Sequence, residues 1–134
     1  MEKEIIIKMS AKTVIFIASI LGALSVGIGA FGAHGLEATL QANGRMDTFE
    51  TAVKYQFYHT LGLFLLGILM LNMESHYFHW AFYSFLAGIT VFSGSLYTLS
   101  LTNVTWLGAI TPIGGVGFIL GWVFIGLGVL NAKG

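Results

Sequence analysis

The sequence predicts an all-α protein, an integral membrane four-helix bundle in which a short amphipathic helix leads into the second span. The first observation is composition, because 56% of the 134 residues are hydrophobic and only 9% are charged. Soluble domains carry about 25% charged residues, so this composition excludes a water-soluble globule and a disordered chain. The second observation is placement, because the few charged residues gather at the termini and in one polar segment, with a single glutamate between spans.

Several apolar stretches are long enough to cross a bilayer, which takes about 20 residues per helix. Residues 75–132 contain no Asp, Glu, Lys or Arg, which leaves room for two spans on either side of the polar Thr102 and Asn103. We expect a single transmembrane domain, residues 1–134, with spans at 13–33, 55–73, 77–101 and 106–130 and a loop at 34–54. The first stretch is longer than the core of about 7–15 residues typical of a cleaved signal, so we expect it to be retained.

The basic residues that flank the spans predict the orientation of the chain. With the N-terminus inside, four terminal lysines lie on the cytoplasmic side, against Arg45 and Lys54 on the outer side. Because cytoplasmic flanks are enriched in Lys and Arg, we expect both termini to be cytoplasmic. The six basic and six acidic residues cancel, which argues against nucleic acid as a partner. The absence of cysteine excludes disulfides and thiol chemistry.

The polar segment before the second span carries helix signals. Asp47 is followed three residues later by Glu50, which is the spacing of a capping box, and apolar residues then recur at helical spacing. We therefore expect a helix that begins near Thr48, is amphipathic in its first turns and continues into the second span. Asn43 and Gly44 predict a turn before it, and Gly35 is expected to end the first span in the left-handed conformation.

Small residues and the single proline predict how the spans pack. The chain has 18 glycines, and small residues let membrane helices approach closely. The glycines expected at helix contacts are Gly27, Gly88, Gly94, Gly117 and Gly121. Two interpretations stay open, a tight bundle within one chain and a glycine face that joins copies in a homo-oligomer. Pro112 either starts the fourth helix or kinks it, in which case opened backbone would line a pocket.

The histidines are the main candidates for chemistry. His34 and His59 flank the loop and are expected near one membrane face with Glu50, where two imidazoles and a carboxylate could bind Zn²⁺ or Fe²⁺. Alternatively, His34 caps the first helix and His59 forms a hydrogen bond with a neighbouring span or with Glu50. No metal is assigned, since the ligand set is incomplete. His76 and His79 are expected in an interfacial aromatic belt at the opposite face. We expect no ionisable residue at the centre of any span, which argues against a proton or ion pathway.

Four ordered motifs together carry a family resemblance. They read GAFGAHGL at 29–36, FETAVKYQFYH at 49–59, FSGSLY at 92–97 and WLGAITPIGG at 106–115. The chain resembles the DUF423 family, also called UPF0382, of small bacterial inner-membrane proteins that are related to the mitochondrial transmembrane protein 256. The resemblance implies a four-span protein of the bacterial inner membrane whose function is uncharacterised, and it supplies no catalytic or ligand residues.

No catalytic motif occurs in the sequence, so no enzymatic activity and no cofactor is assigned. We expect membrane lipids as partners and an accessory role, in which the chain associates with itself or with a larger membrane complex. The alternative is a lipid-, quinone- or metal-binding protein that uses the His34, Glu50 and His59 end of the bundle, and a small transporter comes third. The candidate ligand-binding residues are His34, Glu50, Tyr55, Gln56, His59, Ser93 and Tyr97.

Overall fold

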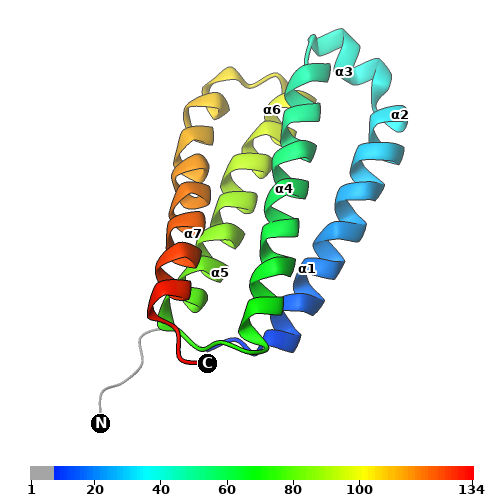
Figure 1. Ribbon diagram of the computed structural model, residues 1–134. Helices are drawn as coiled ribbons and strands as arrows, with labels where there is room; N and C mark the ends of the chain where they lie inside the picture. Colours follow the sequence, from blue (N-terminus) through cyan, green and yellow to red (C-terminus); the bar gives the residue numbers. More distant parts are fainter. Residues whose placement is uncertain (1–7) are drawn as a thin grey trace.

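The computed structural model describes residues 8–134, and its long helices run up and down in one bundle (Figure 1). The first long helix joins α1 (Ala11–Val26), the π-helical turn η1 (Gly27–Gly32) and α2 (Ala33–Gly35). The short helix α3 (Glu37–Asn43) crosses one end of the bundle, and α4 (Met46–Met70) then returns along α1.

The second half of the chain repeats this up-and-down course. One long helix joins α5 (His76–Gly88), the π-helical turn η2 (Ile89–Ser93) and α6 (Gly94–Thr102). A 3₁₀ turn, η3 (Thr105–Ala109), then leads into α7 (Thr111–Asn131). The start of α1 and the end of α7 lie at the same end of the bundle, and α3 lies at the other (Figure 1).

Three of the long helices have the length and composition to cross a membrane. They are Ala11–Gly35, His76–Thr102 and Thr105–Asn131. The expected all-α fold is confirmed for the described residues, which contain no strand, but three spanning candidates are found where four were expected. The fourth long helix, α4, falls outside this set, and its first turns carry Asp47, Glu50 and Lys54.

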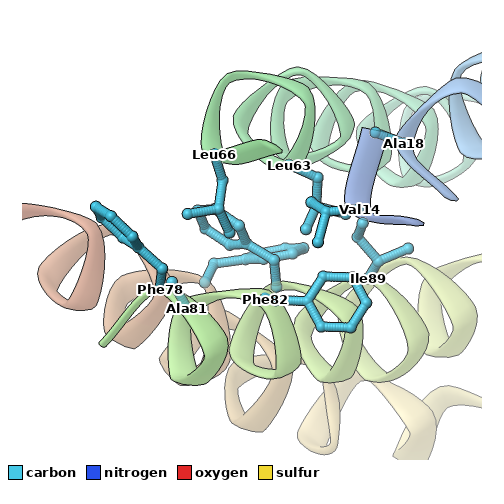
Figure 2. Close-up of a cluster of buried hydrophobic side chains, with 10 residues drawn as sticks. Val14, Ala18, Leu63, Leu66, Phe78, Ala81, Phe82 and Ile89 are labelled. Carbon is cyan, nitrogen blue, oxygen red and sulfur yellow. The ribbon is translucent and has the colours of Figure 1, made fainter. Parts of the chain in front are cut away.

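The core lies where the four long helices meet. α1 packs on α4, α5 packs on α7, and α4 joins the two pairs through η2 and α6. Figure 2 shows the buried cluster, in which Val14 of α1 and Leu63 of α4 face Phe82 of α5. These buried side chains provide much of the van der Waals contact between the helices. The helices present mainly apolar surfaces on every side.

Glycines make the closest helix contacts between α5 and α7. Gly88 lies against the ring of Phe118, and a Cβ on Gly117 would come within 3.1 Å of the Ser84 carbonyl oxygen. A Cβ on Gly27 or Gly94 would meet nothing within 4 Å. The helix contacts expected at Gly27 and Gly94 are therefore not formed within one chain, because the bundle partners of these helices approach on other faces.

The start of α4 differs from the expected capping box. The helix begins at Met46, and its N-cap Arg45 makes no side-chain capping bond. Asp47 lies inside the first turn, where its charge favours the helix N-terminus without capping it. Pro112 lies in the first turn of α7, so the late helix start is confirmed and the kink is not observed.

The expectation that Gly35 ends the first span in the left-handed conformation is also wrong. The helix passes through Gly35 because the Leu36 N–H still donates to the Gly32 carbonyl, at 2.8 Å. Leu36 makes the turn instead, with φ of −106°. Among the described residues, the left-handed positions are Gly44, which ends α3, and Asn103, which ends α6.

Candidate functional site

His59 lies near the midpoint of α4 rather than at the start of a span. The helix has 25 residues, and at about 1.5 Å per residue His59 is about 20 Å from Met46. The expectation that no ionisable residue lies at the centre of a span is not contradicted by His59, since α4 is not among the three spanning candidates. The second span was expected from Tyr55, and the helix that contains it begins at Met46, two residues before the start near Thr48 that the sequence predicted.

His34 and Glu50 do not join His59. A Cβ on Gly32 would lie 3.6 Å from Phe49 Cζ, which places His34 level with the first turns of α4. His59 is ten residues further along α4 than Phe49, or about 15 Å at the helical rise. His34 and Glu50 are exposed, and the described residues contain no group of three His, Cys, Asp or Glu side chains that could hold a metal.

His59 instead lies in an aromatic shell contributed by three helices. Its ring stacks on Phe118 of α7, with centroids 3.5 Å apart and an interplanar angle of 8°. Phe85 of α5 lies edge-on at 5.5 Å and Trp122 of α7 at 5.9 Å. The imidazole is only 6% exposed, and its Nδ1 is 2.7 Å from the Tyr55 carbonyl oxygen.

The second ring nitrogen of His59 is available. Within residues 8–134, Nε2 has no hydrogen-bond partner. Over the same residues, the one fully enclosed side-chain nitrogen or oxygen without a partner is Thr60 Oγ1. Nε2 is therefore not fully enclosed, although His59 as a whole is only 6% exposed.

A polar layer next to this shell ties α4 to its neighbours. Gln56 is 4% exposed, and its Oε1 accepts a hydrogen bond from the Tyr97 hydroxyl at 2.6 Å. Gln56 Nε2 donates to the Leu21 carbonyl of α1 at 3.5 Å, and Ser93 Oγ donates to the Ala52 carbonyl at 2.8 Å. Of the candidate residues, Gln56, Ser93 and Tyr97 form hydrogen bonds where α4 meets η2 and α6, whereas His59 contacts Tyr55 and the aromatic rings of α5 and α7.

Replacing Tyr97 with phenylalanine is expected to destabilise the bundle by about 1–2 kcal/mol, because Gln56 Oε1 loses its donor inside the protein. The free energy of unfolding in an SDS titration of mixed micelles measures this loss. Tyr58→Phe is the control, since Tyr58 is 52% exposed on the same helix and a surface change costs under about 0.5 kcal/mol. Equal losses in the two variants would contradict the assigned role of the bond.

Sequence reasoning missed the aromatic shell. Phe85, Phe118 and Trp122 look like ordinary apolar residues of a membrane span, and the four-residue spacing of Phe118 and Trp122 was the one signal that they share a helix face. The π-helical turn η2 places Phe92 with its ring 4.5 Å from that of Tyr55. Such turns occur frequently at functional sites.

A separate cavity of about 340 Å³ opens at the end of the bundle where α1 begins. Its lining includes Ser10, Glu74 and His79, and His79 Nδ1 accepts a hydrogen bond from the Met9 N–H at 3.2 Å. None of the candidate ligand-binding residues lies in this cavity.

The helical bundle, its apolar helices and its exposed apolar side chains define a small integral membrane protein. Residues 28–115 match the family model described as "Protein of unknown function (DUF423)", and the chain belongs to this family. The resemblance noted in its motifs is thereby confirmed.

Named relatives support the same assignment. The chain is 51% identical to a UPF0382 membrane protein of Staphylococcus haemolyticus over 110 residues, which cover 79% of this chain and 88% of the relative. It is 44% identical to the UPF0382 membrane protein YwdK of Bacillus subtilis, covering 85% and 93%. It is 36% identical to the UPF0382 inner membrane protein YgdD of Escherichia coli, covering 93% and 95%. No solved structure matches the chain.

Proposed function

We propose that this membrane protein binds a lipid-soluble ligand at His59. The observation that carries the proposal is an imidazole near the midpoint of α4 whose Nε2 has no partner among the described residues but is not fully enclosed. Ionisable side chains inside membrane bundles are costly, and they mark functional sites by default. The aromatic shell around the ring favours a ligand that is largely apolar.

The proposal includes four membrane crossings, with α4 as the fourth. The 25 residues of α4 extend about 37 Å at the helical rise, which exceeds a hydrocarbon core of about 30 Å. α4 also runs between the spanning candidates that contain α1 and α5. His59 would then lie near the membrane midplane. The cytoplasmic placement of both termini stays a prediction from the basic residues.

The other ligand and transport hypotheses have less support. A metal site needs converging ligands, whereas Glu50 is nine residues, or about 14 Å, from His59 along α4 and His34 lies level with the first turns of α4. A proton or ion pathway usually links several charged groups, whereas the ring contacts of His59 are all aromatic.

Association with another membrane helix is the second candidate function, in line with the accessory role expected from the sequence. Ser19, Ala23 and Gly27 follow one another at four-residue spacing on the first long helix. Ser19 and Ala23 are exposed, and nothing lies within 4 Å of a Cβ built on Gly27. Small residues on an outer helix face favour close contact with another helix.

Native mass spectrometry of protein released from its own membrane tests ligand binding. We expect a retained lipid-soluble mass that disappears in His59→Phe, a variant that keeps an aromatic ring against Phe118 but lacks both nitrogens. His34→Phe, which changes an exposed histidine outside the site, should retain the mass. Equal retention in all three proteins, or no retained mass in any, would contradict the proposal.

The same spectra test association. A second polypeptide that is retained by the wild type and lost in Ala23→Leu supports the second candidate function. A particle containing one polypeptide under every release condition contradicts it.

A further inference from the structure

We propose that the ligand at His59 is a quinol, which presents a phenolic hydroxyl on a flat apolar ring, rather than the oxidised quinone. This inference rests on the proposed binding of a lipid-soluble ligand at His59. It follows from the hydrogen bond that fixes the imidazole and from the side chains that surround the free nitrogen.

The tautomer of His59 follows from the backbone contact. A carbonyl oxygen can only accept a hydrogen bond, so the 2.7 Å contact with the Tyr55 carbonyl requires the proton on Nδ1. In the neutral imidazole, Nε2 then carries a lone pair and acts as an acceptor. Because Nδ1 faces the backbone of α4, Nε2 at the other edge of the ring is directed away from it.

A hydrogen-bond acceptor at this position favours a ligand that carries a hydrogen-bond donor. The ring contacts of His59 are Tyr55, Phe85, Phe118 and Trp122, so they include no carboxylate that would pair with an imidazolium. A quinone, an ester or an ether offers only acceptor oxygens and would leave two lone pairs facing each other. Unmatched polar groups are costly in an apolar environment, so a hydroxyl donor is preferred.

The surroundings of Nε2 favour a flat ring on that hydroxyl. Tyr55 and Trp122 are 39% and 47% exposed, and their ring centroids lie 6.0 Å and 5.9 Å from that of the imidazole. Phe118 covers the face of the imidazole and is 3% exposed. An aromatic ligand that binds Nε2 beside these exposed rings gains ring contacts that an aliphatic hydroxyl lacks.

The test uses protein labelled with ¹⁵N-histidine in lipid nanodiscs. Four probes distinguish the need for a donor hydroxyl from the need for a flat ring. They are a decyl-substituted benzoquinol kept reduced, the corresponding quinone, its dimethyl ether and a diacylglycerol with an aliphatic hydroxyl. We expect the quinol to shift the non-protonated Nε2 resonance of His59 and to bind about tenfold or more tightly than the other probes. His59→Phe should abolish this preference, and His34→Phe should preserve it.

The outcomes separate this inference from the proposed function. Binding of the quinone, the ether or the diacylglycerol as tight as that of the quinol overturns the choice of a phenolic donor. A protonated Nε2 in the ligand-free protein overturns it as well. If the native spectra show a His59-dependent mass of another lipid class, the proposed function stands and the quinol assignment fails. If no mass depends on His59, both fail.

Discussion

Gly114→Ala is expected to destabilise the bundle by about 3 kcal/mol, the upper end of the usual cost of overpacking. A Cβ on Gly114 would fall on the backbone nitrogen of Phe92 and within 2.7 Å of its Cα. Backbone atoms cannot rotate out of the way, so α7 would have to move away from η2. That movement would strain the neighbouring hydrogen bond between Ser95 and Thr111, which is 2.6 Å long.

Gly126→Ala is the matched control, because Gly126 lies on the same helix and a Cβ there would meet nothing within 4 Å. Alanine is the better helix former by about 1 kcal/mol, so this variant should keep or slightly raise stability. SDS titration in mixed micelles measures both free energies of unfolding. Similar values for the two variants would show that α7 and η2 are not in close backbone contact.

The composition was enough to predict the helical fold, because lipid leaves few other structures open to a segment that crosses the membrane. Stretches without charge had to be helices, since backbone polar groups in lipid must bond within the segment. The start of α4 could not be found in this way, because a helix is not bounded by its apolar part. The helical spacing of the apolar residues instead predicted a start near Thr48, two residues from the observed start at Met46, and His59 lies near the centre of the resulting helix.

The polar candidates could be named from the sequence, but their partners could not. Gln56 and Tyr97 stand out as polar groups in apolar surroundings, yet their hydrogen bond depends on which faces of α4 and α6 meet. Phe118 carries no signal beyond its four-residue spacing from Trp122, because a membrane span contains many similar residues. Its contact with His59 is set by Gly88, whose missing side chain lets the Phe118 ring enter between the helices.

Phe118→Ala is therefore expected to have the second large effect, a loss of about 3–5 kcal/mol. The ring is 3% exposed, lies against Gly88 and has its centroid 5.3 Å from that of Phe92. Its removal leaves a cavity that the rigid helices can fill only in part. Phe16→Ala is the control, since Phe16 is 65% exposed on α1. An equally small loss in both variants, measured by SDS titration, would contradict the core position of Phe118.

Phe118→Leu separates stability from the orientation of the imidazole. Leucine keeps most of the buried volume, so the free energy of unfolding should stay within about 1.5 kcal/mol of the wild type. It removes the flat surface on which the His59 ring stacks at 3.5 Å, while the bond from Nδ1 to the Tyr55 carbonyl remains possible. The variant should therefore fold and keep the Nδ1 proton, but bind the benzoquinol probe more weakly. Unchanged binding would show that the Tyr55 carbonyl alone sets the orientation of the imidazole.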